Sequence, residues 1–372
     1  MQKLKQFQDI AADPIAYATH WKAKTQGRVI GYFCSYVPEE IIWAAGVLPY
    51  RILGAGGSIS RADEHLQAYS CSLVRGALDD ALTGQLDFLD GAVFPHTCDS
   101  IQRLSDIWRL NTGFDFHLDL VLPVKLNTQS AENYMLAVIK KFRSDLAAEL
   151  NVKITNGKLK KAILTLNQIR SHLRRLYEIR SAFPGSIRSS DVHAIVKASM
   201  VMDRDEFSEK LSEIVEWLEG RKHEPWSEKK RLVLTGGICS MPDIYPEIED
   251  AGGAVVWDDF CTGSRYFEGT VDPEGDPVNS IGQRYFNRIV CPAKHRDSFS
   301  RATDLIKMVE NTQAEGVIFI LLKFCDPHAF DYPYIKTLLD RSGISSMLLE
   351  IEDQQTSMAQ LRTRLEAFIE RL

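Results

Sequence analysis

Cysteine is the residue type whose placement in this chain could do chemistry. "YSCSLVRGALDDAL" and "FPHTCDSIQRLSDIW" each place a cysteine, Cys71 and Cys98, just before a run with helical spacing, and "GVIFILLKFCDPHAFDYP" ends a strand-like run in Cys325. Cys34 and Cys261 follow strand-like runs in the same way. Thiolates bind soft metals and iron–sulfur clusters. Because free cysteine is also a small buried hydrophobe, each of these residues could equally belong to a core.

Loops that follow the strands of a parallel sheet can face a ligand, because the carboxyl ends of those strands border the binding crevice. A helix N-terminus stabilises a thiolate, so we expect the helices after Cys71 and Cys98 to lower the pKa values of these thiols. The cysteines are not clustered in the sequence, and no C-x-x-C pair occurs. Their spacing therefore leaves both an iron–sulfur site and a set of buried structural thiols open.

Histidine, carboxylate and arginine side chains lie near these cysteines in the sequence. His96 in "FPHTC" and His328 in "CDPHAFDYP" could act as acid or base, or could simply be hydrogen-bonded loop histidines. Glu39 and Glu40 begin a short helical run, where one could cap the helix and the other could point into a crevice. Arg265 in "DDFCTGSRYF" could hold a phosphate or carboxylate, or could pair with a neighbouring aspartate. The candidates for acid–base catalysis are Glu39, Glu40 and His96.

The overall composition argues against several classes of protein. The 372-residue chain has 44 basic and 50 acidic residues and a net charge of −6, which lacks the basic surplus of a nucleic-acid-binding domain. Its longest apolar runs are far shorter than the roughly 20 residues of a membrane-spanning helix. Its start lacks the apolar core of a signal peptide, and seven cysteines, an odd number, do not suggest a secreted disulfide framework. We expect a cytoplasmic protein that binds neither nucleic acid nor membrane.

Two glycine-rich stretches resemble phosphate-binding loops only in part. "LGAGGSISR" has Ile59 where the third glycine of G-x-G-x-x-G would stand, and "LTGGICSMPDI" lacks the lysine and the following hydroxyl residue of a phosphate loop. Tight turns are the more economical interpretation, because glycine adopts turn conformations at little steric cost. The sequence therefore predicts no ATP or dinucleotide site, although the backbone of either loop could still approach a ligand phosphate.

The elements that must position these residues follow from periodicity. We expect strands within 27–37, 48–54, 88–96 and 117–124, with helical segments between several of them. Apolar residues then recur at helical intervals in four segments, 132–150, 158–182, 189–202 and 206–220. Further strands are expected within 231–237, 253–260, 316–324 and 345–353, before a last helix in 358–372. The predicted class is α/β with two open parallel sheets, divided into an N-terminal α/β lobe (1–130), a helical subdomain (131–228) and a C-terminal α/β lobe (229–372).

Taken together and in order, four segments resemble the family of 2-hydroxyacyl-CoA dehydratase and benzoyl-CoA reductase subunits. The segments are "GYFCSYVPEEIIWAAGVLPYRILG", "YSCSLVRGALDDALTGQLDFLDGAVFPHTCDS", "DDFCTGSRYF" and "LLKFCDPHAFDYPYIKTLLDRSGISSMLLEIE". The similarity extends from about residue 27 to the end of the chain. It implies two Rossmann-like lobes and a helical region.

The resemblance also implies a cofactor and its ligands. Family members hold a [4Fe–4S] cluster with three cysteines from the two lobes, and the matching residues here are Cys71, Cys98 and Cys325. Cys34 and Cys261 lie in family-like segments and could be near the cluster, whereas we interpret Cys239 and Cys291 as structural. A subgroup with a double-cubane cluster uses extra cysteines between the first two ligand positions, and none occurs between Cys71 and Cys98. This departure argues against a double-cubane cluster.

The resemblance further implies one-electron chemistry on a CoA thioester, through a ketyl radical in the dehydratases and reduction of an aromatic ring in the reductases. Its expected partners are a second related cluster-bearing subunit, an ATP-dependent iron–sulfur activator protein and the acyl-CoA substrate. Three hypotheses stay open: a radical dehydratase subunit, which is favoured; a benzoyl-CoA reductase-type subunit; and a non-catalytic scaffold that binds CoA thioesters and keeps its cysteines in a core.

Overall fold

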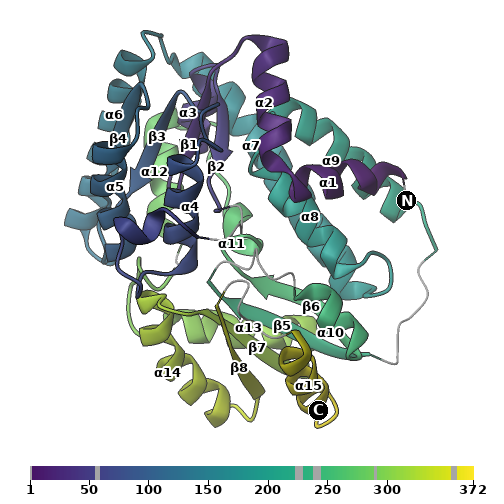
Figure 1. The fold of residues 1–372 in the computed structure, drawn as a ribbon. Coiled ribbons are helices and arrows are strands. Elements are labelled where there is room, and N and C mark those ends of the chain that lie inside the picture. The colour runs from purple at the N-terminus through teal and green to yellow at the C-terminus, as the bar shows by residue number, and fades with distance from the viewer. Residues whose placement is uncertain (1, 55–58, 223–228, 238–243, 289–290, 353–357) are drawn as a thin grey trace.

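The computed structural model describes residues 2–54, 59–222, 229–237, 244–288, 291–352 and 358–372. Within these ranges the chain forms two four-stranded parallel sheets, which lie one above the other in Figure 1. The first sheet contains β1 (Val29–Tyr32), β2 (Leu48–Arg51), β3 (Gly91–Pro95) and β4 (Phe116–Leu120). The second sheet contains β5 (Lys230–Gly236), β6 (Gly253–Asp259), β7 (Gly316–Leu322) and β8 (Ser345–Ile351). The predicted α/β class with two open parallel sheets is confirmed.

Both sheets have the same strand order. The first sheet is ordered β2-β1-β3-β4 and the second is ordered β6-β5-β7-β8, and all strand pairs within them are parallel. In each sheet the chain therefore turns to one side after its first strand and to the other side after its second strand. This reversal lies between β1 and β3 and again between β5 and β7. Such a switch point opens a crevice at the carboxyl ends of the strands.

Helices cover both faces of each sheet. On the first sheet, one face packs against α4 (Ser72–Leu82) and α5 (Asp99–Asn111), and the other packs against α3 (Glu39–Ala44) and α6 (Gln129–Glu149). The second sheet is covered by α10 (Tyr245–Asp250), α15 (Met358–Ile369), α13 (Ser300–Thr312) and α14 (Asp326–Arg341). Strands buried on both faces are apolar without a break, as in the fully buried "GVIFILL" of β7.

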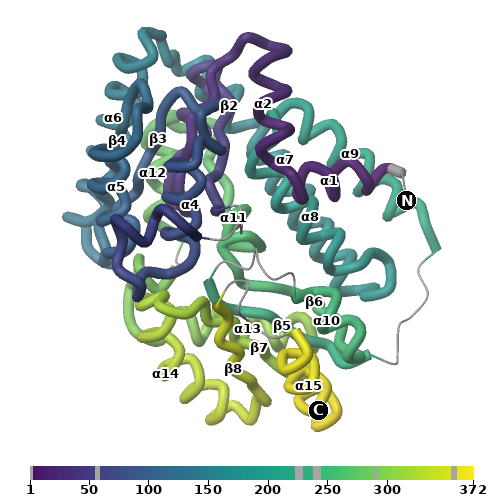
Figure 2. The backbone as a smooth tube through the Cα atoms, in the orientation of Figure 1, coloured from purple at the N-terminus to yellow at the C-terminus, as the bar shows by residue number. Residues whose placement is uncertain are grey.

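The four helical segments predicted between the sheets all form. They are α6 and α7 (Asn156–Ala182), α8 (Ser189–Ser199) and α9 (Arg204–Glu219). The side chains of Thr128 and Thr155 accept hydrogen bonds at the N-termini of α6 and α7, as expected for capping residues. The first two helices, α1 (Gln2–Ala12) and α2 (Pro14–Thr25), lie beside α8 and α9 on one side of the molecule (Figure 2).

The helices between the sheets share their cores with the first lobe. Apolar side chains of α7 pack with residues of β1 and β3 in two buried clusters. The segment after β6 returns to the first lobe, where α12 (Pro277–Asn287) packs against α6. It passes through the short helix α11 (Ser264–Phe267), which lies centrally between the sheets in Figure 1. The proposed boundaries at 130 and 228 stay a prediction.

Buried polar contacts join the two lobes. The Tyr177 hydroxyl, on α7, donates to Asp258 Oδ2 at 2.8 Å, and Arg180 Nη2 donates to the same oxygen at 3.1 Å. At the ends of the strands, Arg51 Nη1 donates to the carbonyl of Cys261 at 2.8 Å. The first contact fixes the helices to β6, and the second joins the carboxyl ends of β2 and β6.

Two neighbouring carboxylates on α3 form buried ion pairs. Glu39 Oε2 lies 2.8 Å from Arg204 Nη2, and Glu40 Oε1 lies 2.5 Å from Arg170 Nη2. Arg284 Nη1 lies 4.0 Å from the same oxygen of Glu40. Burial alone would raise the pKa of Glu40, but the guanidinium groups of Arg170 and Arg284 hold it below its ordinary value. These pairs attach α3 to α7, α9 and α12.

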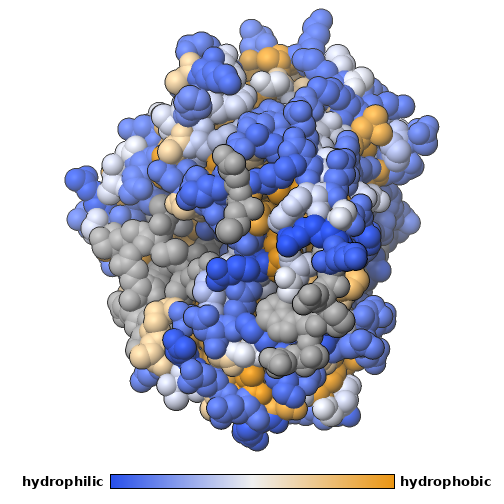
Figure 3. Space-filling model, turned by 90° about the vertical axis from the view of Figure 1, so that its right-hand side faces the viewer, coloured by the Kyte–Doolittle hydropathy of each residue, from blue (hydrophilic) through white to orange (hydrophobic). Residues whose placement is uncertain are grey.

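Apolar residues lie both in the helices and on the outer surface. None of the helices in the described ranges combines the length and the apolar character that crossing a bilayer needs. The face seen in Figure 3 is largely hydrophilic, with small separate apolar areas. Scattered apolar side chains of this kind are normal on a folded protein.

Replacing Gly236 by alanine is expected to destabilise the second sheet. Gly236 ends β5 with a φ of 144°, and a Cβ atom there would lie 1.9 Å from the carbonyl oxygen of Ile320 on β7. We expect a loss of more than about 1 kcal/mol, measured by urea unfolding followed by circular dichroism. Gly113→Ala is the control, because a Cβ there meets no atom of the described residues within 4 Å. Equal stabilities of the two variants would contradict the close approach of β5 and β7 at Gly236.

Replacing Glu40 by alanine is expected to leave the buried Arg170 without its carboxylate. We expect a loss of about 3–5 kcal/mol in urea unfolding at neutral pH, because one member of a buried pair then remains uncompensated. Asp205→Ala is the matched control, because the Lys161–Asp205 pair is exposed and such pairs contribute at most about 1 kcal/mol.

The contribution of Glu40 to the free energy of unfolding also depends on pH. Since the folded-state pKa of Glu40 lies below the ordinary value of 4.5, its contribution is present above that pH. The contribution is lost as the pH falls through the folded-state pKa. The difference between wild type and Glu40→Ala should therefore shrink in acid, and a difference that grows there would contradict the assignment.

Candidate functional site

Three cysteines occupy equivalent positions at the starts of helices. Cys71 is the N-cap of α4, Cys98 is the N-cap of α5, and Cys325 is the N-cap of α14. Cys98 follows β3 and Cys325 follows β7, so both lie at the switch point of their own sheet. The sequence therefore predicted their places at the carboxyl edges of the strands correctly.

The three thiols lie within electrostatic reach of one another. Burial raises the pKa of Cys325 well above its ordinary value, and Cys71 and Cys98 raise it further. Burial likewise raises the pKa of Cys98 to about 12, and Cys71 and Cys34 contribute. Backbone N–H groups of Ser100 and Ile101 act in the opposite direction on Cys98. The start of the helix therefore lowers the pKa of Cys98 as expected, but burial outweighs this effect, so the net shift in the protein alone is upward.

The other described cysteines lie nearby. Cys34, which has a positive φ of 61° directly after β1, has a raised pKa because of burial and the neighbouring Cys261. Burial also raises the pKa of Cys291 to about 12, with contributions from Cys261 and Cys34. The Ser35 hydroxyl donates to the Cys261 carbonyl at 3.5 Å across the two lobes. Cys239 lies outside the described residues.

Two buried cations lie among these thiols, and neither forms an ion pair with a carboxylate of the described residues. Arg51 is 1% exposed, and its Nε and Nη2 atoms have no hydrogen-bond partner in the described part of the chain. Lys294 is fully buried, and its Nζ donates to the carbonyls of His96 and Leu122 at 3.3 and 3.1 Å. Burial lowers the pKa of Lys294, whereas Cys291, Cys34 and Cys98 raise it.

Sequence reasoning missed both residues. Arg51 meets Cys261 across a separation of 210 positions, and Lys294 reaches His96 across 198 positions. Their neighbours in the sequence carry no motif. A charged residue at the end of the buried strand β2 was the one available signal for Arg51.

His96 is oriented by a carboxylate. Its Nε2 atom lies 2.9 Å from Asp119 Oδ1, on the adjacent strand β4. Ser105 donates to the same oxygen at 2.5 Å. Burial alone would raise the pKa of Asp119, but hydrogen bonds from His117, Ser105 and His96 hold it well below its ordinary value. Because this carboxylate is ionised, Nε2–H of His96 can donate to it, which orients the ring.

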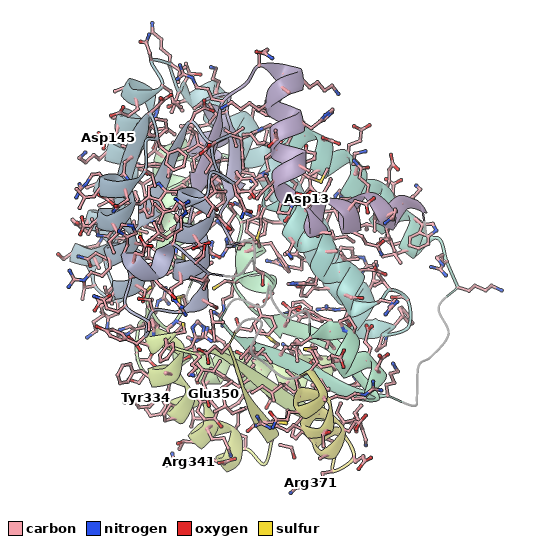
Figure 4. The ribbon with its side chains drawn as sticks, in the orientation of Figure 1. Asp13, Asp145, Tyr334, Arg341, Glu350 and Arg371 are labelled. Carbon is pink, nitrogen blue, oxygen red and sulfur yellow. The ribbon has the colours of Figure 1, made fainter. Side chains whose placement is uncertain are left out.

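A cavity of about 520 Å³ opens beside Cys98, between the two lobes. His96 and Cys98 line it from the first lobe, and Asp326, Phe330 and Tyr334 line it from the second. Phe330 is 76% exposed at the mouth of the cavity. Tyr334 is labelled in Figure 4 at the outer side of α14. The arrangement combines a thiol, a histidine and exposed aromatic rings at one opening.

A second cavity of about 660 Å³ lies on the other side of Arg301 and is lined by charges of both signs. Arg265 reaches this cavity but is held by Asp259, with Nε at 2.8 Å from Oδ1 and Nη2 at 3.0 Å from Oδ2. Of the two alternatives for Arg265, the structure therefore shows pairing with a neighbouring aspartate.

The structure does not bring Glu39 and Glu40 to the lining of either cavity described above. Both carboxylates are buried in ion pairs with Arg204 and Arg170. His96, by contrast, lines the cavity next to Cys98. The catalytic assignments of Glu39, Glu40 and His96 stay predictions, and the geometry favours His96.

Comparison with known proteins gives consistent results over the full length. A family model described as "2-hydroxyglutaryl-CoA dehydratase, D-component" matches residues 34–372. The chain is 28% identical over 367 residues to the (R)-phenyllactyl-CoA dehydratase beta subunit of Clostridium sporogenes, covering 98% of this chain and 97% of the relative. It is 28% identical over 371 residues to the lactoyl-CoA dehydratase beta subunit of Anaerotignum propionicum, covering 99% and 98%.

A reductase component is similar to nearly the same extent. The chain is 27% identical over 361 residues to one of the benzoyl-CoA reductase subunits of Thauera aromatica, covering 94% of this chain and 92% of the relative. These matches agree with the resemblance seen in the four cysteine-containing segments. Since the family model spans nearly the whole chain, the chain belongs to the 2-hydroxyglutaryl-CoA dehydratase D-component family.

Proposed function

We propose that this chain is the iron–sulfur subunit of a 2-hydroxyacyl-CoA dehydratase. The observation that carries the proposal is the convergence of Cys71, Cys98 and Cys325, each at a helix N-terminus and within electrostatic reach of the others. Three relatives named as dehydratase beta subunits support a dehydratase over a reductase. The proposed ligands of a [4Fe–4S] cluster are these three thiolates.

The surroundings of the thiols fit such a group. Thiolate ligands make an iron–sulfur site negatively charged, and a buried cation without an anionic partner is unfavourable. Within the described residues Arg51 and Lys294 are cations of this kind, and they lie beside Cys34, Cys98 and Cys291. An anionic group bound by the thiols would compensate them.

A cluster has different spatial requirements from a single metal ion. No three histidine, cysteine or acidic side chains in the described part of the chain are close enough to share one metal ion. A cluster places each thiolate on a different iron, so its ligands stand farther apart than those of a single ion. The proposed cluster therefore does not need the three thiols to meet at a single ion.

When bound, the cluster would supply one electron to a thioester carbonyl, giving the ketyl radical chemistry expected of the family. The chain's own residues would hold and orient the substrate. The cavity beside Cys98 would admit the thioester, and Phe330 and Tyr334 at its mouth would restrict water. His96, oriented by Asp119, would take up or return a proton at Nδ1.

The proposed function needs partners. Relatives named as beta subunits support a second subunit in the complex. An ATP-dependent iron–sulfur activator is proposed as the electron donor, as the family resemblance implies, and the lack of phosphate-loop residues in both glycine-rich stretches is consistent with it. The substrate would be an acyl-CoA.

Single replacements of the proposed ligands test the assignment. We expect Cys71→Ala, Cys98→Ala and Cys325→Ala each to prevent a stable cluster, because each removes one of three protein ligands. Iron and acid-labile sulfide would be measured after anaerobic reconstitution, with circular dichroism to confirm folding. Cys291→Ala is the matched control, since that thiol is also buried, and it should retain the wild-type iron content. Full iron in all three ligand variants would reject the ligand set.

A further inference from the structure

His328 makes a contact to a proposed ligand that the function above does not use. It lies in the first turn of α14, and its side chain is 4% exposed. Its Nδ1 atom is 3.4 Å from Cys325 Sγ, and its Nε2 atom is 3.0 Å from Arg265 Nη1. The ring therefore connects a thiol to a buried guanidinium.

The contact with Arg265 fixes the protonation state of the ring. A guanidinium group can only donate hydrogen bonds, so Nε2 of His328 must accept and carries no proton. The doubly protonated ring would place an N–H against an N–H and is excluded by the same contact. The neutral ring then carries its proton on Nδ1, which faces Cys325 Sγ, and the ring also interacts with the backbone carbonyl of Gly236.

Arg265 is itself held in one orientation. Asp259 accepts two hydrogen bonds from it, at 2.8 and 3.0 Å, and the Thr235 hydroxyl donates to the same carboxylate at 2.9 Å. Arg301 lies between Asp259 and Asp331, with hydrogen bonds of 3.1 and 2.7 Å. The side chain of Arg265 is 1% exposed. This network leaves the guanidinium no freedom to turn away from His328.

The hydrogen-bond donors around the Cys325 thiol differ from those around the Cys98 thiol. The Cys98 thiol interacts with backbone N–H groups of Ser100 and Ile101 in the first turn of its helix. The Cys325 thiol interacts with the backbone N–H of His328 and, in addition, with the His328 ring. A hydrogen bond to a ligand sulfur favours the more negative, reduced form of an iron–sulfur group and so raises its reduction potential.

We propose that His328 is a positioning residue that donates its Nδ1 proton to the Cys325 sulfur and so raises the reduction potential of the iron–sulfur group held there. The inference rests on the proposed function, because it concerns one of the three proposed ligands. Arg265 and Asp259 act through His328 by fixing which nitrogen carries the proton.

The tautomer can be tested in the protein without a cluster. In the full chain labelled with ¹⁵N-histidine, long-range ¹⁵N–¹H correlation spectra distinguish the two neutral tautomers. The signal of His328 would be identified by its absence in His328→Asn. We expect a neutral ring with its proton on Nδ1. A proton on Nε2, or a doubly protonated ring, would overturn the proposal whatever the variants do.

A measurement of the reduction potential tests the proposed effect of the hydrogen bond from His328 to Cys325. His328→Leu removes the donor, whereas His328→Asn can place an amide N–H near the position of Nδ1. We expect His328→Leu to bind wild-type amounts of iron but to have a more negative midpoint in an electron paramagnetic resonance titration. The loss of a hydrogen bond to a charged group corresponds to roughly tenfold in the reduction equilibrium, or about 59 mV for one electron. His328→Asn should recover most of the wild-type potential.

His193→Leu is the matched control, because His193 is equally buried at 4% exposure but packs against Tyr245 instead of a cysteine. It should leave the potential unchanged. An unchanged reduction potential in an iron-loaded His328→Leu protein would overturn the proposed role of His328 and would leave the proposed function standing. A wild-type chain that binds no iron would contradict the proposed function and this inference with it.

Discussion

The hydrogen bond from Arg51 to the carbonyl of Cys261 joins the carboxyl ends of the two sheets. In a parallel sheet the carboxyl ends of all strands lie at the same edge. Two lobes that meet at those edges therefore bring residues from distant parts of the chain together. Cys98 and Cys325 come from different lobes and lie within electrostatic reach of each other in this way. The helices between the sheets, fixed to β6 by Tyr177, hold the two edges in contact. The contacts among the thiols depend on this arrangement.

The packing of the two lobes against each other also buries two positively charged side chains. Arg51 and Lys294 are removed from water without a carboxylate ion pair in the described ranges, and buried charges of this kind are costly unless compensated. The thiols around them are the groups that can become negative. Their pKa values are raised in the protein alone, so the proposed metal group would be needed to keep them deprotonated. The site is therefore suited to a ligand that supplies negative charge through sulfur.

Sequence reasoning predicted the features that depend on local pattern. Strands buried on both faces gave continuous apolar runs, and the amphipathic helices gave regular spacing, so the two sheets and the four central helices were identified. The cysteines were correctly placed after strands and before helices, because those positions follow from neighbouring residues. The family resemblance supplied the proposed ligand set, which no spacing rule would have given.

The missed features depend on contacts between distant segments. The effect of burial on Cys98 could not be read from its helix, because the surrounding residues come from other elements. Glu39 and Glu40 face Arg204 and Arg170, more than a hundred positions away, and nothing local marks either glutamate as paired. The return of α12 to the first lobe is likewise a matter of tertiary packing.

The most direct test of the account is an iron and sulfide count on the anaerobically purified chain, combined with electron paramagnetic resonance of the reduced protein. The account predicts about four irons per chain and a spectrum that changes when a CoA thioester is added. A colourless protein that binds no iron, even after reconstitution, would contradict it and would return Cys71, Cys98 and Cys325 to a structural role.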